Sequence, residues 1–280
     1  MRVKKSVFVK FFFILAIAVF AWILIENDGF EPSKIAFDQP SCSIDVSSED
    51  VSLAQEILSQ KFHYLSSGRQ CFVFESEDKD YVIKFLNKRN FIYSKILNKF
   101  SFVPKIKKII QRKERKHLLT FLSMKLAYEN LREETKIVYI NLNENILLRQ
   151  KIKAVNKCKA PFEIDVDKTV FILQKKVTPF FSYLKNTDDN EKIKKAIDSY
   201  FNLVLSRCKK NIGDDDFNII DNIGFYQGKA VIMDIGKLYF SESLDKKDEI
   251  LLSTKLLKQW LSQNKPELIP FFEEKLKMHL

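Results

Sequence analysis

Histidine, glycine and closely spaced cysteines are scarce in this 280-residue sequence. It has three histidines and six glycines, and its four cysteines, Cys42, Cys71, Cys158 and Cys208, lie far apart. Because the sequence contains no CxxC pair and no His/Cys spacing typical of a zinc site, a zinc centre is not expected. The sequence also has no GxSxG motif and no Cys/His pairing, which disfavours a nucleophilic hydrolase. The histidines are expected to have no chemical role.

Long Pro-, Gly- or Ser-rich stretches and internal repeats are also missing, which argues against a solenoid or a low-complexity chain. A hydrophobic content of 46%, with 25 phenylalanines, predicts a globular body with a sizeable core. The chain is basic, with 47 Lys+Arg against 36 Asp+Glu and a net charge of +11. This charge suits an anionic membrane surface or a phosphorylated ligand.

The first 25 residues predict a membrane anchor. The basic flank "MRVKK" precedes "SVFVKFFFILAIAVFAWILI", in which Lys10 is the one charged residue, and about 20 apolar residues suffice to span a bilayer. The segment continues as "ENDGFEPSK" without the small residues of a signal-peptide cleavage site. We therefore expect an uncleaved transmembrane helix over residues 1–25 and a membrane localisation, with the side of the membrane left open.

The rest of the chain predicts an α+β fold with two lobes. Residues 26–50 are polar and are interpreted as a linker. Residues 51–178 are expected to form a β-rich N-terminal lobe with inserted helices, and residues 179–280 a mainly helical C-terminal lobe. The C-terminal helical region should be interrupted at Pro266 and Pro270.

Local patterns predict the main elements. A helix should begin at Ser47 or Ser48 in "SSEDVSLAQEILSQKF". The β-rich runs "QCFVFES" and "YVIKFL" predict a hairpin, "KIVYINLN" and "TVFILQKKV" further strands, and "IGFYQ" and "AVIMDIG" a second hairpin. "DDNEKIKKAIDSYFNLVLSRCKK" is typical of an amphipathic helix. Residues 88–136 are helical in pattern, and their apolar contacts are assigned to Leu119, Leu122, Leu126 and Tyr128.

An acidic cluster stands out in this basic chain. The stretch "NIGDDDFNIIDNIGFYQGKAVIMDIGK" contains Asp214, Asp215, Asp216, Asp221 and Asp234. It predicts either a solvated acidic loop beside a hairpin or a cation site that holds nucleotide phosphates. A calcium loop is disfavoured because an isoleucine stands where such loops need glycine.

Lys84 is a second unusual residue, because it lies in the apolar strand "YVIKFL". A lysine in such a strand needs an anionic partner. The alternative is a lysine that extends to solvent at a sheet edge.

In order and spacing, from about residue 60 to residue 260, these motifs resemble the protein-kinase-like superfamily, which holds protein kinases and aminoglycoside or lipid phosphotransferases. "LSSGRQCFVFES" resembles a reduced glycine-rich loop that retains Gly68, and "YVIKFL" resembles the third strand with its phosphate-pairing lysine, Lys84. "NIGFYQGKAVIMDIG" is similar to the end of a catalytic loop, a hairpin and the metal-binding triplet, here Asp234-Ile235-Gly236.

The resemblance implies a phosphotransferase that uses ATP and Mg²⁺. Lys84 would hold the nucleotide phosphates beneath the loop at Gly68, and Glu129, with Glu133 in reserve, would hold Lys84. Asn222 and Asp234 would bind the magnesium ion, because Mg²⁺ prefers hard oxygen ligands.

The catalytic base would be Asp216 or Asp214, and here the sequence departs from the family pattern. The usual catalytic aspartate lies five residues before the metal-binding asparagine, but five residues before Asn222 is Phe217. A loop of altered length is therefore required, and the glycine-rich loop keeps only Gly68.

Two functions stay open. One is a membrane-anchored, divergent kinase-like enzyme that moves a phosphoryl group from ATP to an unknown acceptor. The other is a catalytically inactive kinase-like scaffold or a membrane-tethered interaction protein. The basic run "KIKKIIQRKERK" has little aromatic interleaving, so nucleic acid is not expected as a partner.

Overall fold

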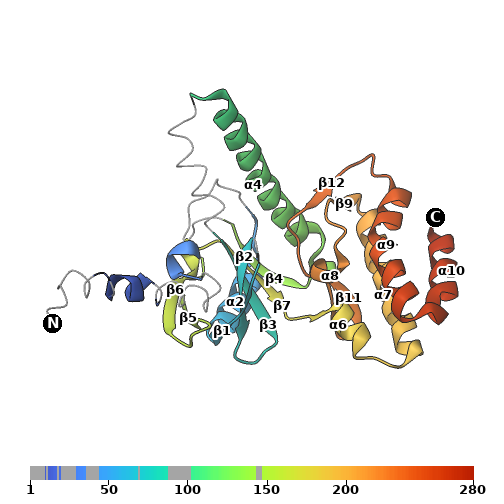
Figure 1. The fold of residues 1–280 in the computed structure, drawn as a ribbon, viewed down its shortest axis with the longest axis horizontal. Helices are drawn as coiled ribbons and strands as arrows, with labels where there is room; N and C mark the ends of the chain where they lie inside the picture. The colour runs from blue at the N-terminus through green and yellow to red at the C-terminus, as the bar shows by residue number, and fades with distance from the viewer. Residues whose placement is uncertain are drawn as a thin grey trace, which may run out of the picture.

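The structure is a computed structural model that describes residues 10, 12–17, 19, 30–35, 44–68, 70–87, 102–142 and 147–280. It confirms the predicted α+β class: one part is built on a seven-stranded sheet and the other on packed helices (Figure 1). The sheet lies among residues 61–175, and most of the helices follow it in the chain.

The sheet has the strand order β4-β7-β3-β2-β1-β5-β6. All its neighbours run antiparallel except β1 and β5, which are parallel. The hairpin β5–β6 extends the sheet beyond β1, and neither strand was predicted. The strands are β1 (Lys61–Ser67), β2 (Cys71–Ser76), β3 (Tyr81–Leu86), β4 (Ile137–Asn141), β5 (Lys151–Val155), β6 (Pro161–Asp165) and β7 (Phe171–Lys175).

Aromatic side chains fill the core on one face of this sheet. Phe72 and Phe74 of β2 and Phe85 of β3 are almost fully buried, as their alternation along the strands requires. Phe30 packs edge-on against Phe72 and Phe74, with ring centroids 5.0 and 5.2 Å apart. It precedes the short 3₁₀ helix η1 (Pro32–Ile35), so this part of the predicted linker lies against the sheet.

Helix α2 (Ser48–Leu58) begins as its sequence predicts. The Ser47 hydroxyl accepts a hydrogen bond from the Asp50 amide at 3.1 Å and so caps the helix. The Asp50 carboxylate in turn accepts two hydrogen bonds from Arg132, at 2.7 and 2.8 Å, and one from Tyr128. The hydrogen bond from Arg132 is the largest cause that holds the pKa of Asp50 below its usual value.

Helix α4 (Pro104–Asn130) connects the two parts and projects beyond them at its N-terminal end (Figure 1). Its buried face includes Thr120, Phe121 and Met124, whereas Leu119 and Leu122 are about half exposed. Leu119 and Leu122 were therefore assigned wrongly, whereas Leu126 packs partly buried against the core. Tyr128 is buried as expected.

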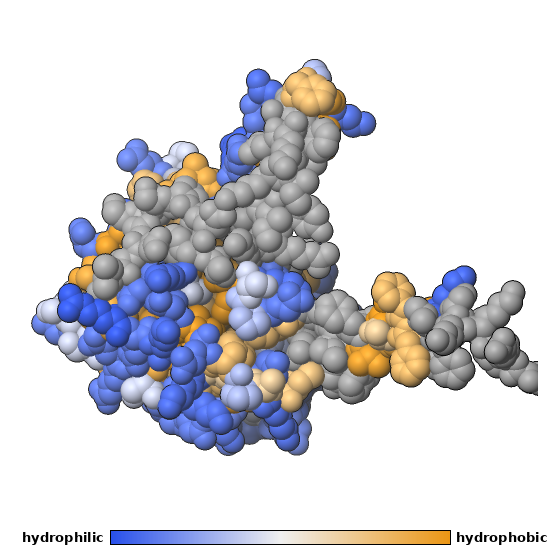
Figure 2. All heavy atoms as spheres, turned by 90° about the vertical axis from the view of Figure 1, so that its left-hand side faces the viewer, coloured by the Kyte–Doolittle hydropathy of each residue, from blue (hydrophilic) through white to orange (hydrophobic). Residues whose placement is uncertain are grey.

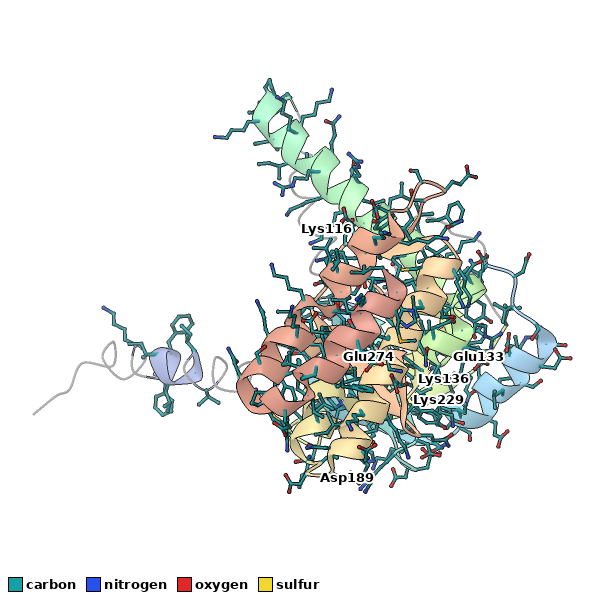
Figure 3. All side chains as sticks on the ribbon, turned by 90° about the vertical axis from the view of Figure 1, so that its right-hand side faces the viewer. Lys116, Glu133, Lys136, Asp189, Lys229 and Glu274 are labelled. Carbon is teal, nitrogen blue, oxygen red and sulfur yellow. The ribbon has the colours of Figure 1, made fainter. Side chains whose placement is uncertain are left out.

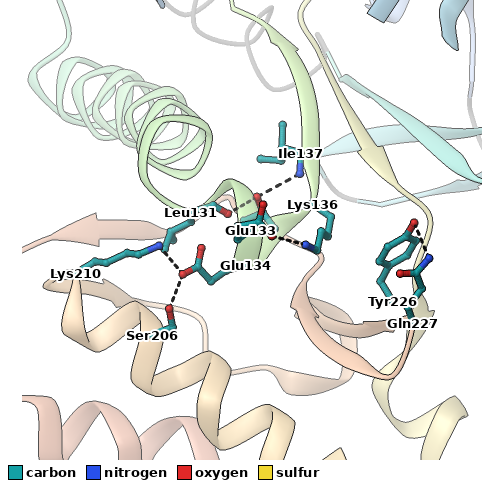
Figure 4. A network of polar contacts seen from close by, with 10 residues as sticks. Leu131, Glu133, Glu134, Lys136, Ile137, Ser206, Lys210, Tyr226 and Gln227 are labelled. Atoms are coloured by element: carbon teal, nitrogen blue, oxygen red, sulfur yellow. Dashed lines mark hydrogen bonds and ion pairs between the residues drawn. The ribbon is translucent and has the colours of Figure 1, made fainter. Parts of the chain in front are cut away.

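The short helix α5 (Arg132–Thr135) fastens this region to the helical part. Lys210 donates to the buried carboxylate of Glu134 at 2.5 Å, and so does the hydroxyl of Ser206, also at 2.5 Å (Figure 4). Burial raises the pKa of Glu134, but these two hydrogen bonds, a backbone hydrogen bond and the charge of Lys210 together outweigh burial, and the pKa is lowered.

The helical part packs around a second hydrophobic core that includes Tyr200, Phe201, Leu257 and Phe272. Its elements are β8 (Thr178–Pro179), α6 (Phe180–Lys185), α7 (Asn190–Lys209), β9 (Ile212–Asp214), α8 (Ile219–Asn222), β10 (Ile223–Tyr226), β11 (Lys229–Ile232), β12 (Leu238–Phe240), α9 (Lys246–Asn264), η3 (Pro266–Leu268) and α10 (Ile269–His279). The remaining short element, η2 (Val166–Lys168), lies between β6 and β7.

Only one of the two predicted proline interruptions occurs. α9 ends before Pro266, as expected, but Pro270 lies in the first turn of α10. A proline costs little there, because the amide it lacks has no partner within the helix.

The structure contradicts the predicted transmembrane helix and the membrane localisation. No helix in the parts of the chain that the structure describes is long and apolar enough to cross a bilayer. Within the segment 1–25, the structure describes residues 10, 12–17 and 19, all of them helical. The other residues of this segment fall outside the description. Phe12 and Phe13 of this segment are exposed, and Figure 2 shows hydrophobic atoms on a projection from the body.

Candidate functional site

Lys84 lies in β3 and points toward the helical part. Its ammonium group donates a hydrogen bond to the backbone oxygen of Met233 at 2.5 Å, across 149 positions of sequence. Burial lowers the pKa of Lys84, and the negative charge of Asp234 is among the effects that oppose this shift. The lysine and the aspartate of the predicted triplet are thus electrostatic neighbours.

The hairpin β10–β11 brings Asn222 and Asp234 together. β10 and β11 pair from Ile223 with Ile232. Beyond this pair, the backbone oxygen of Asn222 accepts hydrogen bonds from the amides of Met233 at 2.6 Å and Asp234 at 3.3 Å. Residues twelve positions apart in the chain therefore lie side by side at the open end of the hairpin.

Asp234 is exposed, and its carboxylate accepts a hydrogen bond from the amide of Gly236 at 3.1 Å. A Cβ atom at Gly236 would lie 2.9 Å from Oε1 of Gln70 and 3.4 Å from Oδ1 of Asp234. Gln70 belongs to the turn between β1 and β2 and reaches the triplet. Sequence analysis did not single out Gln70, although it stands within the motif compared with a glycine-rich loop.

The two base candidates occupy different environments. Asp214 is buried in β9, its Oδ1 accepts the amide of Asp216 at 2.9 Å, and burial raises its pKa to about 6. Asp216 is about one-third exposed and pairs with Lys237, with Oδ2 and Nζ 2.8 Å apart. Burial raises the pKa of Asp216, but Lys237 and hydrogen bonds to the carboxylate together outweigh burial, and the pKa is lowered. The side-chain amide of Asn222 donates to the backbone oxygen of Asp216 at 2.9 Å.

A buried ion pair between α7 and α9 contacts the backbone at the start of this acidic loop. Arg207 of α7 and Glu249 of α9 are 6% and 4% exposed, with Nη1 and Oε1 2.6 Å apart. Glu249 also accepts the backbone amide of Asp214 at 3.0 Å, and Arg207 donates to Ser253 at 3.1 Å. The ion pair thereby fixes the backbone where β9 ends.

A small cavity lies beside the acidic loop. It is lined by Tyr200, Leu203, Val204, Arg207, Asp214, Asp216, Phe217, Asn218, Ile219, Asn222, Ile223, Ile232 and Ser253. Both base candidates therefore border one space.

Neither acid assigned to Lys84 interacts with it. Glu129 pairs with Lys125 at 3.6 Å on the surface of α4. Glu133 is highly exposed and pairs with Lys136 at 2.6 Å, near Lys229 (Figure 3). The carboxylate whose charge opposes the effect of burial on the pKa of Lys84 is that of Asp234.

Helix α4 instead presents a serine to the triplet. The buried hydroxyl of Ser123 donates to the backbone oxygen of Ile235 and accepts the amide of Leu238 at 2.7 Å. A serine within an apolar helical pattern carries no sequence signal for this role. Gly68 closes the turn between β1 and β2 by donating to the Cys71 oxygen at 2.9 Å, and a Cβ there would be free of close contacts.

The donor atoms at the hairpin end suit a hard cation. Across the described ranges, no three His, Cys, Asp or Glu side chains gather as a metal site. Asp234 and Asn222 offer one carboxylate and one amide oxygen, and Mg²⁺ often takes only one or two protein ligands while phosphates and waters complete its shell. The residues present therefore fit a magnesium ion that arrives with a nucleotide.

Comparison with known proteins yields no family. No protein-family model and no curated protein matches the sequence. Among solved structures, the chain is similar to a crystal structure of WbdD, with 16% identity and a TM-score of 0.38 over 77% of this chain and 45% of that one. It is also similar to the Rv3197–erythromycin complex from Mycobacterium tuberculosis, with 11% identity and a TM-score of 0.37 over 80% of this chain and 60% of that one.

The chain thus spans less than two thirds of either protein. The two likenesses are too low to carry a conclusion about family or activity. The kinase-like interpretation rests on the chain's own arrangement: a strand lysine is hydrogen-bonded to the backbone oxygen directly before a hairpin-end triplet, and an asparagine lies at the same end of the hairpin.

Proposed function

We propose that this protein is a divergent kinase-like phosphotransferase that moves a phosphoryl group from ATP to a hydroxyl group of an acceptor. The observation that carries the proposal is the convergence of Lys84, Asn222 and Asp234. Lys84 lies in the seven-stranded sheet and Asp234 follows β11 of the three-stranded sheet, and the ammonium group of Lys84 is hydrogen-bonded to the residue directly before Asp234. A strand lysine and a hairpin-end aspartate are the parts that hold nucleotide phosphates in this chemistry.

Lys84 has the role of a phosphate-binding cation. Its environment lowers its pKa because burial penalises the charged form, and an incoming polyphosphate would favour that form again. The backbone oxygen of Met233 occupies one of the three donors of the ammonium group, which leaves two for phosphate oxygens.

Asn222 and Asp234 would hold Mg²⁺, which supplies neutralising charge on the transferred phosphate. The side-chain nitrogen of Asn222 donates to Asp216, so its side-chain oxygen is the atom left for a cation. Asp234 is exposed, so its carboxylate is accessible to a ligand.

Asp216 is the better candidate for the base. Its side chain is 36% exposed, whereas Asp214 is buried at 9% and holds the amide of Asp216. A base must reach the hydroxyl whose proton it accepts. Asp214 then positions Asp216, and the acceptor remains any molecule that bears a hydroxyl group.

A catalytically inactive, kinase-like scaffold is the second candidate. One observation favours it: no acid of the described helix α4 pairs with Lys84, which is held by a backbone oxygen instead. In an inactive relative this arrangement would be permanent, because nothing would draw Lys84 away from Met233.

Thermal unfolding with ATP tests the proposal. A ligand that binds only the folded state stabilises it by about 2.7 kcal/mol at a hundredfold excess over Kd. We expect millimolar ATP to raise Tm only when Mg²⁺ is present, and Asp234→Asn to abolish this rise. Asp198→Asn is the matched control, because Asp198 is a partly exposed aspartate that pairs with Lys275 at 2.9 Å away from the site.

Two results would contradict the proposal. If wild type shows no ATP-dependent rise, the nucleotide site is refuted and the scaffold is favoured. If Asp234→Asn keeps the full rise and Asp198→Asn does too, the nucleotide binds without the proposed magnesium ligand.

A further inference from the structure

Lys237 is the residue directly after the Asp234-Ile235-Gly236 triplet, and it holds Asp216. Its Nζ lies 2.8 Å from Oδ2 of Asp216, and the two side chains are 42% and 36% exposed. The proposed base is therefore neutralised by a lysine that stands next to the proposed magnesium ligand. This arrangement needs an explanation, because a carboxylate engaged by an ammonium group is a weaker proton acceptor.

The backbone of Lys237 is fixed on both sides. Its own oxygen accepts the amide of Asp215 at 3.2 Å. The next residue, Leu238, pairs with Asp214 in the β9–β12 ladder and donates its amide to Ser123 at 2.7 Å. Three elements, α4, β9 and β12, thus fix the backbone position of Lys237, and its side chain can move by rotation about its own bonds.

The chemistry of lysine suits two alternating partners. An ammonium group is a compact charge with three donors on a flexible four-carbon stem. A terminal phosphoryl group carries more negative charge and more acceptor oxygens than one carboxylate, so it competes well for such a cation. Asp216 is the ion-pair partner of Lys237, and the proposed magnesium ligand Asp234 stands three positions before it.

We propose that Lys237 leaves Asp216 for the terminal phosphoryl group when ATP binds, so that one lysine both binds the transferred group and releases the base. This role rests on the proposed function. In the reaction, the acceptor oxygen forms a bond to the γ-phosphorus while the bond from that phosphorus to the β-phosphate oxygen breaks. The electron pair leaves with ADP, and the hydroxyl proton passes to the freed carboxylate of Asp216.

The competing explanation is a purely structural ion pair. Exposed pairs contribute about 0–1 kcal/mol to stability, and a pair of this kind would have no preference among nucleotides. The two explanations differ in one measurable quantity, the ratio of the affinities for nucleoside triphosphate and diphosphate. Only a lysine that contacts the third phosphate changes this ratio.

The experiment measures Kd for the β,γ-methylene analogue of ATP and for ADP, both with Mg²⁺, by calorimetry on the full chain. Lys237→Met should weaken binding of the analogue by about tenfold to a hundredfold, the range of a charge-assisted hydrogen bond, and change ADP binding by less than about twofold. Lys237→Arg should restore part of the loss. Lys258→Met is the control, since Lys258 is half-exposed and pairs with Glu273 at 2.5 Å elsewhere.

Asp216→Asn supplies a test of opposite sign. Removing the carboxylate frees Lys237, so the preference for the analogue over ADP should rise. An unchanged or smaller preference would contradict the exchange.

The outcomes separate this role from the proposed function. If wild type binds both nucleotides but Lys237→Met weakens both equally or neither, the lysine forms a structural pair and the nucleotide site stands. If wild type binds neither nucleotide, the proposed function itself is refuted and the role of Lys237 falls with it. Circular dichroism melting of each variant shows that a loss of binding is not a loss of fold.

Discussion

Breaking the buried ion pair between Arg207 and Glu249 should destabilise the protein strongly. Removal of one partner of such a pair leaves an uncompensated buried charge and costs about 3–5 kcal/mol. Arg207→Met should cost an amount in this range, because Glu249 would keep only the amide of Asp214 as a donor. The destabilisation by Glu249→Gln should lie at the lower end of this range. Glutamine keeps an oxygen for the amide of Asp214, and Arg207 keeps its hydrogen bonds to Ile212 and Ser253.

The double variant Arg207→Met/Glu249→Gln distinguishes an ion pair from two independent residues. It removes both charges together, so it should be more stable than the sum of the single effects by about 1–3 kcal/mol, the usual coupling of contacting residues. Urea unfolding followed by circular dichroism measures all three variants. The surface pair of Asp198 and Lys275 supplies the control cycle, with an expected coupling of about 0–1 kcal/mol.

The refuting result is additivity. If the two single effects sum to the double effect within about 0.5 kcal/mol, the two charges do not interact in solution. The claim that this ion pair fixes the backbone of the acidic loop at Asp214 would then be refuted.

Three further predictions follow from individual contacts. Because Arg132 lowers the pKa of Asp50 in the folded state, the unfolded state takes up the proton first as pH falls, and the stability advantage of wild type over Asp50→Asn should be full above about pH 4 and shrink below it. Urea titrations at a series of pH values measure this advantage, and a pH-independent difference would contradict the prediction. Ser123→Ala leaves two buried backbone groups without their partner and should lower the free energy of unfolding by about 2 kcal/mol or more. Thr120→Ala removes only a hydrogen bond within the helix and should lower it less in thermal unfolding, so equal losses would refute the prediction. Gly236→Ala should displace the side chain of Gln70, which a Cβ would approach to 2.9 Å, and lower the free energy of unfolding by about 1 kcal/mol. This loss should vanish in a Gln70→Ala background, and an unchanged loss there would place the strain elsewhere.

The parts of the fold that were predicted correctly depend on local signals. Helix α2 begins after Ser47 because a serine side chain caps the first turn, and that signal is contained in four residues. The hairpin of β2 and β3 follows from apolar alternation on either side of a turn, where Lys79 adopts a φ of 63°. Such features need no knowledge of what packs against them.

The errors concern features that depend on the surroundings. Leu119 and Leu122 fit a helical stripe, but α4 passes between two bodies and buries the side that carries Phe121 and Met124. The hairpin β5–β6 is short, and its outward lysines resemble those of a loop. The anchor was inferred from the length of the apolar run, its basic flank and the missing cleavage site, whereas no helix among the described residues is long and apolar enough to cross a bilayer.

The candidate site was predictable in its parts but not in its connections. Lys84, Asn222 and Asp234 were selected because their order in the chain resembles a known pattern. Lys237 and Ser123 were missed because an ion pair or a hydrogen bond across the fold leaves no trace in the local sequence. Glu129 was assigned from the resemblance, which implies a helix acid for Lys84, but its four-residue spacing from Lys125 favours the surface pair that the structure contains.

The central claim is that Lys84 and Asp234 together hold the phosphates of a nucleotide, and its most direct test is the calorimetric Kd of ATP with Mg²⁺. Wild type and the control Lys258→Met should bind with the same Kd, and Lys84→Met should weaken binding at least about tenfold, the lower end for a charge-assisted hydrogen bond. Without Mg²⁺, wild type should lose affinity and Asp234→Asn should show no further change. Equal Kd values for wild type and Lys84→Met would contradict the claim.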